Sequence, residues 1–172
     1  MAAQEQIARI DPALRRAREL GATVSVDTTN PRVAEHALRA GATLVNDVSC
    51  LADPDLARVA ARAGAVLILM HSREPMSSMA GFSVYPDDAY QDVVHDVLAE
   101  WRRARDRAVE AGMPREDVWL DPGIGFAKNA RHSFELMRRL PELAREGVPL
   151  VLGASRKSFI AAVDDAPPSQ RL

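Results

Sequence analysis

The sequence of 172 residues lacks several features that mark particular protein classes. Its one cysteine, Cys50, excludes an internal disulfide framework, and no apolar run approaches the ~20 residues of a membrane-spanning helix. Lys and Arg (22) do not outnumber Asp and Glu (24), which argues against a nucleic-acid binder that works by bulk charge. The first residues, MAAQEQIARID, lack the basic and apolar regions of a secretory signal. We therefore expect a cytoplasmic globular protein that binds neither nucleic acid nor membrane.

Motifs for several common chemistries are also missing. There is no Gly-rich phosphate loop, no HExxH or paired-cysteine metal motif and no GxSxG nucleophile elbow. The segment DPGIGFAKN comes nearest to a phosphate loop, but its glycine spacing differs and no Lys-Ser/Thr pair ends it. These patterns assign no metal ligand within the chain.

What the sequence does contain is a regular alternation of short apolar runs and longer helical patterns. The runs are rich in Val, Ile and Leu, as in strands buried on both faces of a parallel sheet, and they cover 23–28, 43–48, 65–71, 118–123 and 150–155. The helical patterns, the first four of which stop at a glycine, cover 3–20, 31–40, 54–63, 87–111 and 132–146. We expect Asp87 and Asp88 to open the fourth helix and Pro141 to kink or split the last.

Two architectures of parallel sheet fit this alternation. One is an open doubly wound sheet, and the other is part of a (β/α)8 barrel, which usually needs ~250 residues. Five predicted strands are too few to close a barrel, so the barrel interpretation leaves roughly three strands missing and two sheet edges open. In either case residues 1–172 form a single domain without a linker, and 72–86 is the longest irregular loop.

Polar side chains gather at the carboxyl ends of the predicted strands, where parallel α/β folds place their ligand sites. Asp27, His71 and Asp121 end three of the runs, Asn46 lies in another, and Lys157 follows the fifth. Carboxylates and amides pair with the N–H and amino groups of a flat polar heterocycle, and a lysine donates to a carbonyl. The pattern therefore predicts an enzyme that binds a small polar heterocycle or carbonyl compound.

Several of these residues also have a structural interpretation. Asn30 already supplies the helix cap that Asp27 could otherwise form, which favours a functional role for Asp27. The pattern favours neither role for Asn46, whereas Asp47 is expected to bond backbone groups in a turn. His71 is expected to be a buried histidine with satisfied nitrogens.

The candidates later in the chain also have both a structural and a functional interpretation. Asp121 begins an Asp-Pro-Gly turn, but a carboxylate leaving a buried strand is costly unless it is paired, which favours function. Arg156 and Lys157 open a predicted helix, where the dipole disfavours cations unless an acceptor is bound. Cys50 is expected to be a packing residue, and Met70 a packing residue that can line a pocket.

At these same residues the sequence resembles the dihydropteroate synthase family of folate biosynthesis. The matching blocks cover essentially the whole chain in the family's order: SVDTTNPRVAEHALRAGATLVNDVS (25–49), LMH (69–71), LDPGIGFAKNARHSFELMRRLPEL (120–143) and GVPLVLGASRKSFI (147–160). The family fold is a (β/α)8 barrel. The resemblance therefore implies an incomplete barrel, about strands 3 to 7 with their helices.

The family condenses 6-hydroxymethyl-7,8-dihydropterin diphosphate with p-aminobenzoate to give 7,8-dihydropteroate and pyrophosphate, and the resemblance implies this transferase reaction. Asp27, Asn46 and Asp121 would hold the pterin nitrogens and amino group, and Lys157 would lie against the ring carbonyl. Asp121 and Lys157 carry the implied catalytic roles. The full set of implied substrate-binding residues is Asp27, Asn46, Met70, Asp121, Phe126, Lys157 and Ser158, with Met70 and Phe126 lining the pocket and Ser158 contacting the p-aminobenzoate carboxylate.

The sequence departs from the family pattern at both ends. Family members begin with a strand and loop that carry an asparagine ligand for Mg²⁺ and a TPDSF-like segment, and they end with a strand that bears an arginine and a histidine for the diphosphate. Neither is found in these 172 residues, so the resemblance implies a fragment whose Mg²⁺ ligand lies elsewhere. It also implies a homodimer in the full-length protein, and Cys50 stands where the family usually has glycine.

Two alternative functions stay open. The chain could be a catalytically dead pterin-binding fragment, or it could belong to a pterin-dependent corrinoid methyltransferase, which shares the barrel. The SRKSF block argues against the methyltransferase, because a p-aminobenzoate contact has no use there.

Overall fold

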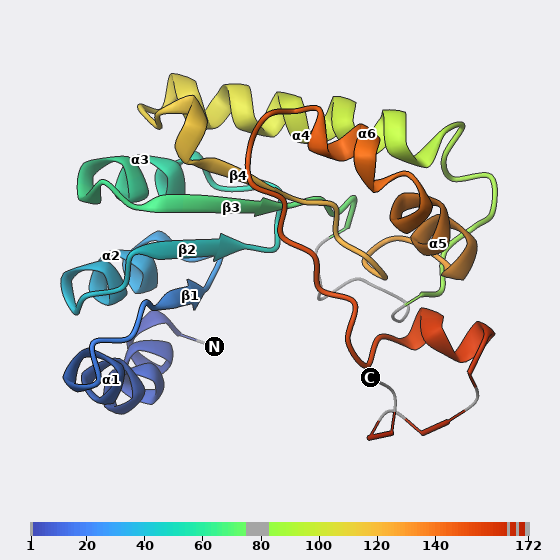
Figure 1. Ribbon diagram of the computed structural model, residues 1–172. Coiled ribbons are helices and arrows are strands. Elements are labelled where there is room, and N and C mark those ends of the chain that lie inside the picture. The colour runs from blue at the N-terminus through green and yellow to red at the C-terminus, as the bar shows by residue number, and fades with distance from the viewer. Residues whose placement is uncertain (1, 75–82, 165, 168, 171–172) are drawn as a thin grey trace.

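The computed structural model describes residues 2–74, 83–164, 166–167 and 169–170 (Figure 1). Four parallel strands form one sheet in the order β1-β2-β3-β4, and a helix connects each strand to the next. No helix among the described residues is long and apolar enough to cross a membrane. The elements are α1 (Ala3–Glu19), β1 (Ser25–Asp27), α2 (Pro31–Arg39), β2 (Leu44–Asp47), α3 (Pro54–Ala63), β3 (Val66–Met70), α4 (Val93–Glu110), η1 (Arg115–Asp117), β4 (Val118–Asp121), α5 (Ala130–Arg138), α6 (Leu140–Ala144) and η2 (Ser158–Ala162).

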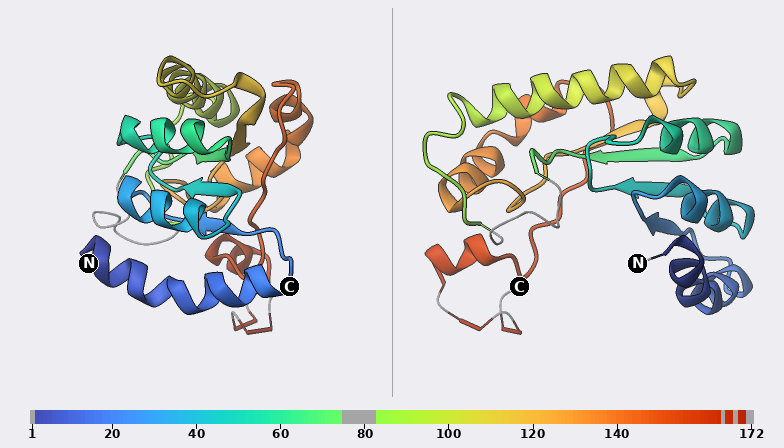
Figure 2. Two further views of the ribbon diagram at one scale, coloured as in Figure 1. Left: turned by 90° about the vertical axis from the view of Figure 1, so that its left-hand side faces the viewer. Right: turned by 180° about the vertical axis from the view of Figure 1, so that it is seen from behind.

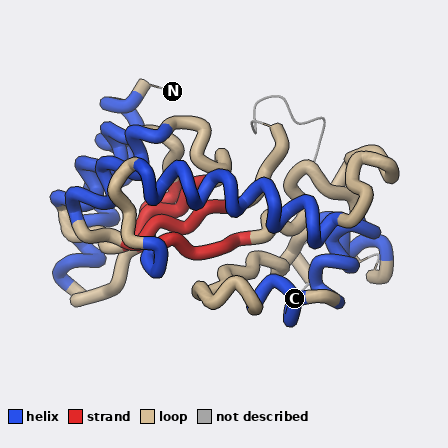
Figure 3. The backbone as a smooth tube through the Cα atoms, turned by 90° about the horizontal axis from the view of Figure 1, so that it is seen from above, coloured by secondary structure: helices blue, strands red, loops and turns tan. Residues whose placement is uncertain are grey.

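Helices α1 to α4 lie on one side of the sheet. In Figure 2 (left) α1 to α4 follow one another in an arc around the strands, and Figure 3 shows α4 lying along them. Side chains that face this arc are buried and form the core together with helix alanines, as in Val26, Val45, Leu67, Leu120 and Ala57. A doubly wound sheet would carry helices on both faces, so the observed layers favour the barrel interpretation.

The opposite side of the sheet carries the polar candidates. Because side chains alternate along a strand, Asp27, Asn46, Met70 and Asp121 all point away from the arc of helices. We call this side the open face. Exposure alternates accordingly along β1, where Asp27 is exposed and Val26 is buried. The loops after the strands lie beyond their carboxyl ends (Figure 1), next to the open face.

Most predicted helices are confirmed with their capping residues. The Asn30 side chain accepts from the N–H of Arg32, and Asp53 caps α3 in the same way through the N–H of Asp55. Gly64 ends α3 in the left-handed conformation, with φ of 61°. The predicted break at Pro141 is also confirmed, because the helical pattern is divided into α5 and α6.

The fourth helix begins later than predicted. Asp87 and Asp88 precede it, and the helix starts at Val93 with Asp92 as its cap. The Asp92 side chain accepts from the N–H groups of Val94 (2.9 Å) and His95 (3.0 Å). Asp87 instead accepts from the side chain of Asn129. The predicted loop 72–86 is described in part, since residues 75–82 lie outside the described residues.

The predicted fifth strand is wrong beyond its first residues. Leu150 forms a single bridge to Leu120, in which Val151 N donates to Leu120 O (2.8 Å). The next donor of a parallel ladder would be the N–H of residue 122, which is a proline and has none. Pro122 therefore ends the pairing, and the segment after Val151 leaves the sheet.

Candidate polar site at the strand ends

Asp27 and Asn46 form a pair on the open face. They are register partners on β1 and β2, and Asn46 Nδ2 donates to Asp27 Oδ2 over 3.0 Å. The other amide atom, Asn46 Oδ1, is buried without a hydrogen-bond partner in the described part of the chain. A buried unpaired acceptor costs about 1–3 kcal/mol, so this atom is suited to an N–H donor on a ligand.

Asp121 ends β4 as the register partner of Met70. Its Oδ1 accepts from the N–H of Gly123 (2.8 Å). Burial raises the pKa of the Asp121 carboxyl, while the Gly123 N–H and the charge of Lys157 act in the opposite direction. The open face thus holds a desolvated carboxylate that lies nearer the carboxyl ends of the strands than the Asp27–Asn46 pair.

The turn after Asp121 crosses directly over the end of β3. Gly123 has φ of +66°, and a Cβ placed on it would lie 2.0 Å from the carbonyl oxygen of His71. Two residues later Gly125 has φ of +79°, and a Cβ there would lie 3.7 Å from Lys157 Cδ. Only glycine satisfies both the left-handed conformation and the close approach at position 123.

Lys157 reaches this turn from the carboxyl-terminal part of the chain. Its Nζ donates to Ile124 O (3.0 Å) and lies 4.0 Å from the centroid of the Phe126 ring. Burial lowers the pKa of Lys157, and the charge of Asp121 opposes that effect. The fold therefore brings Asp121, Phe126 and Lys157 together.

Ser158 lies after Lys157, at the start of the last short helix. It begins η2, a 3₁₀ helix of five residues where the sequence indicated an ordinary helix, and its Oγ donates to Ser83 Oγ (2.8 Å). Met70 is buried at the end of β3, as a packing residue or pocket wall would be.

The structural interpretations of Asp47 and His71 are confirmed. Asp47 is fully buried and accepts from Ser49 N, Ser49 Oγ and Leu51 N, which holds the turn after β2. His71 is also fully buried, with both ring nitrogens engaged. Cys50 is partly buried against the core at φ of 56°, a conformation that suits glycine better than cysteine.

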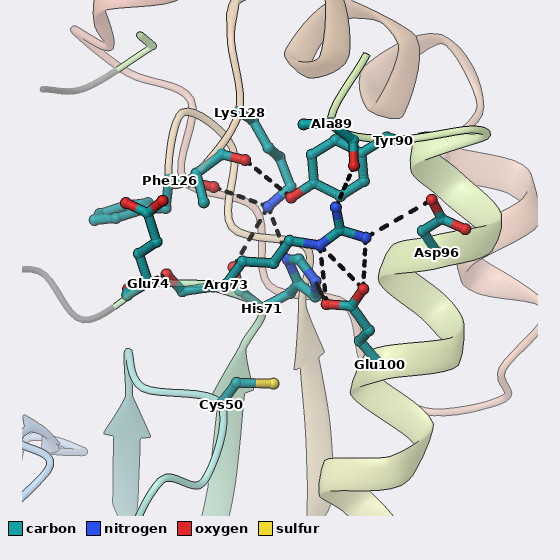
Figure 4. A network of polar contacts seen from close by, with 12 residues as sticks. Cys50, His71, Arg73, Glu74, Ala89, Tyr90, Asp96, Glu100, Phe126 and Lys128 are labelled. Atoms are coloured by element: carbon teal, nitrogen blue, oxygen red, sulfur yellow. Dashed lines mark hydrogen bonds and ion pairs between the residues drawn. The ribbon is translucent and has the colours of Figure 1, made fainter. Parts of the chain in front are cut away.

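Sequence reasoning missed a buried polar network beside the site (Figure 4). His71 Nε2 lies 2.9 Å from Glu100 Oε2, and His71 Nδ1 lies 2.9 Å from Lys128 Nζ. Arg73 binds Glu100 through Nη2 (2.6 Å) and lies 3.8 Å over the ring of Tyr90. The signal that could have found this network is an ionisable residue inside an apolar pattern, such as Glu100 next to Trp101 in α4.

The charges of this network stabilise one another. Burial alone would raise the pKa of Glu100, but the hydrogen bonds from His71 and Arg73 lower it to about 2. Burial and the charge of Lys128 lower the pKa of His71 to about 4. His71 is therefore a neutral imidazole with its proton on Nε2, because Nδ1 must accept from Lys128.

The described residues contain no group of three or more His, Cys, Asp or Glu side chains that could hold a metal ion. The His, Cys, Asp and Glu side chains of these described residues thus do not fit a metal site.

Comparison with known proteins identifies a consistent set of relatives. The family model described as "Pterin binding enzyme" matches residues 1–172. Dihydropteroate synthases from Mycobacterium leprae and Bacillus subtilis are 44% and 37% identical over 90% and 97% of the chain. The chain spans 54% and 55% of the length of these relatives.

Solved structures agree with the sequence relatives. A Yersinia pestis dihydropteroate synthase with a sulfonamide drug superimposes with a TM-score of 0.90 at 32% identity, and the match covers all of this chain and 61% of the other. The Thermus thermophilus enzyme in complex with 4-aminobenzoate gives 0.83 at 41% identity, over 94% of this chain and 61% of that one. The fold is accordingly an α/β parallel sheet that forms part of a (β/α)8 barrel.

Proposed function

The chain belongs to the family of pterin-binding enzymes, and from this premise we propose that the whole protein is a dihydropteroate synthase. The observation that carries the proposal is the polar set on the open face, where the unpaired Asn46 Oδ1 lies on the same side of the sheet as Asp27 and Asp121. Three acceptor groups on one side of a parallel sheet suit the N–H and amino groups of a pterin ring.

The remaining residues supply orientation. Lys157 uses one of its N–H donors on Ile124 O among the described residues, so further donors are available for the ring carbonyl. The Phe126 ring, with Lys157 Nζ 4.0 Å from its centroid, and the buried Met70 would form the apolar part of the proposed pterin site. Fixing the ring in this way converts the encounter of two substrates into a reaction between oriented groups.

In the proposed reaction the aryl amine nitrogen of p-aminobenzoate bonds to the methylene carbon of the pterin. The bond from that carbon to the diphosphate oxygen breaks, its electron pair leaves with pyrophosphate, and the amine loses a proton. Positive charge develops on the pterin as the diphosphate departs, and the Asp121 carboxylate is placed to stabilise it. No covalent enzyme intermediate is required.

Ligands of solved relatives support the two substrates. Thermus thermophilus dihydropteroate synthase has been solved with 4-aminobenzoate and, separately, in complex with 6HMPPP. We carry these ligands to this chain as its substrates, with Ser158 as a contact for the p-aminobenzoate carboxylate. In that role its hydroxyl would exchange its bond to Ser83 for one to the carboxylate.

Three further properties belong to the same proposal. A Mg²⁺ ion would be held by an asparagine, as the resemblance implies. The whole protein would be a homodimer, as the resemblance implies, and would work in the cytoplasm. When bound, the ion would supply charge neutralisation for the departing pyrophosphate.

The test is pyrophosphate release by the full-length protein. We expect release only when the pterin diphosphate and p-aminobenzoate are both present, with omission of either as the control. Pterin binding without release would support a dead pterin-binding protein instead. Methyl transfer from methyltetrahydrofolate would support the corrinoid methyltransferase.

A further inference from the structure

Lys128 is a fully buried lysine with three hydrogen-bond acceptors around its ammonium group. Nζ lies 3.0 Å from Phe126 O, 3.4 Å from His71 O and 2.9 Å from His71 Nδ1 (Figure 4). An ammonium group has three N–H donors, so donors and acceptors match in number. No carboxylate forms an ion pair with Lys128 among the described residues, so the three bonds themselves hold the group in the interior.

These bonds join the turn after β4 to the end of β3. His71 lies on the β3 side, and its backbone N–H donates to Asp121 O (2.8 Å). Phe126 lies on the turn, and the next residue, Ala127, accepts from the hydroxyl of Tyr90 (2.9 Å). Lys128 therefore fixes the turn at its far end, as Asp121 and Gly123 fix it at the near end.

The turn carries the part of the site that meets Lys157. Lys157 Nζ bonds to Ile124 O and lies over the Phe126 ring, so both of its contacts depend on where residues 124–126 stand. A displacement of Phe126 would displace Lys157 with it. Lys128 itself contributes no atom to the open face, because its side chain is fully buried.

The composition of the chain singles out the same two residues. Of its 22 Lys and Arg residues, only Lys128 and Lys157 are lysines. One binds the backbone of Phe126 and the other lies over its ring. The three rotatable donors of an ammonium group match the three acceptors around Lys128 Nζ, whereas the donors of arginine are fixed in a planar fork.

We propose that Lys128 is a positioning residue that sets the place of Phe126 and Lys157 against the pterin substrate. The proposal rests on the proposed function for the identity of that substrate. His71 and Glu100 extend the hydrogen-bonded network of Lys128 to α4, because Glu100 accepts from the neutral His71 and forms an ion pair with Arg73.

The charge state of Lys128 provides a second way to test its positioning role. Burial lowers the pKa of Lys128 to about 7, against the opposing charge of Asp121. A neutral amine has two donors for three acceptors, so the turn loosens as pH rises through that pKa. Charged and titratable groups face Lys128 from every element packed against it. They are Asp121 from β4, Cys50 from the turn after β2, His71 and Arg73 from the end of β3, Tyr90 and Glu100 from the segment around α4, and His132 from α5.

Activity and stability should respond to this titration with opposite signs. In the unfolded chain Lys128 has its ordinary pKa of 10.5, whereas in the folded protein its pKa is about 7. Between these two pKa values the unfolded chain binds more protons, so the free energy of unfolding increases as pH rises. We expect kcat/KM to fall over the start of the same range. Unfolding therefore cannot account for that fall.

The first experiment is Lys128→Met in the full-length protein, with Arg103→Met on the exposed side of α4 as the matched control. We expect kcat/KM to fall by about tenfold or more, with a raised KM for the pterin diphosphate. The reason is that displaced Phe126 and Lys157 side chains weaken ground-state binding as well as orientation of the substrate. A merely structural role would lower the amount of active enzyme and leave KM unchanged. An unchanged KM in a folded Lys128→Met protein overturns the proposal.

The second experiment keeps an acceptor for His71 and removes a charge. Glu100→Gln retains an acceptor for His71 but removes the negative charge that raises the pKa of Lys128. We expect the alkaline limb of kcat/KM to move to lower pH, with Glu110→Gln as the control on the exposed end of α4. A limb that does not move overturns the proposal, and this variant decides if Lys128→Met does not fold.

The third measurement does not depend on turnover. The protein is labelled with ¹³C at lysine Cε, and we expect the Lys157 resonance to titrate with a pKa below the ordinary 10.5. We expect this pKa to move toward 10.5 in Lys128→Met, and the Lys157 chemical shift at fixed pH to change in Glu100→Gln. A Lys157 titration that is the same in all proteins overturns the proposal. Wild-type protein that releases no pyrophosphate would overturn the proposed function alone, because the Lys157 titration still decides this inference.

Discussion

Gly123 is the residue at which backbone geometry constrains the site most tightly. We predict that Gly123→Ala destabilises the protein by at least about 2 kcal/mol, because the new Cβ would meet the His71 carbonyl in a left-handed conformation. Chemical unfolding of the full-length protein measures this loss. Gly147→Ala is the matched control, since Gly147 has φ of +72° and nothing within 4 Å of the Cβ position. Equal losses in the two variants would contradict the role of crowding.

Asp121 and Lys157 are the residues on which the proposed chemistry depends. We predict that Asp121→Asn and Lys157→Ala each lower kcat/KM by a factor of ~10² or more, because each removes a charge next to the reacting pterin. Asparagine keeps the acceptor for Gly123 N, so the turn is preserved. Pyrophosphate release measures the rate, and Asp88→Asn, on an exposed residue before α4, is the control. Native rates in either site variant would refute its assignment.

At the scale of elements, the cap of α4 distinguishes the predicted helix start from the observed one. We predict that Asp92→Ala lowers the free energy of unfolding by ~1 kcal/mol, because Asp92 accepts from Val94 N and His95 N. Asp88→Ala should change it little. The folded-state pKa of Asp92 is lowered, chiefly by the hydrogen bond from the His95 N–H. The stabilisation that Asp92 provides is therefore present at neutral pH and is lost as pH falls through this folded-state pKa. Thermal unfolding of both variants at pH 7 and in acid tests the pair, and equal losses would favour the predicted start.

The elements could be predicted because their signals are local. Asn30-Pro31 and Asp53-Pro54 place a cap before a helix, and Pro141 breaks one, whatever the rest of the molecule does. The fifth strand could not be predicted from its own residues, because its pairing ends at a proline about thirty residues earlier in the chain.

The site was predictable to the extent that strand ends determine it. Asp27, Asn46 and Asp121 share the open face because β1, β2 and β4 are parallel and their register is set by the sheet. The Lys128 network depends instead on α4 packing across β3 and β4, and no spacing in the sequence brings Glu100 to His71. The resemblance supplied the remaining residues, Phe126, Lys157 and Ser158, which periodicity alone does not connect.

At the scale of the whole molecule, the sheet has two incompletely paired edges. Among the described residues β1 pairs only with β2, and beyond β4 there is only the Leu150 bridge. We predict that the isolated 172-residue chain self-associates, because unpaired backbone N–H and C=O groups accept another strand. Size-exclusion chromatography with light scattering measures the mass, with the full-length protein as the control. A concentration-independent species of 18.8 kDa would contradict the prediction.

The scarcity of lysine gives this segment an unusual chemical reactivity. Lys128 is fully buried, so Lys157 is the one lysine amine in these residues that reagents can reach, and its lowered pKa increases the fraction of nucleophilic free amine. An aryl or pterin-like molecule that carries a mild acylating group would therefore meet a single reactive side-chain amine here. Covalent labelling of Lys157, and its protection by bound pterin, becomes a direct measure of occupancy of the site.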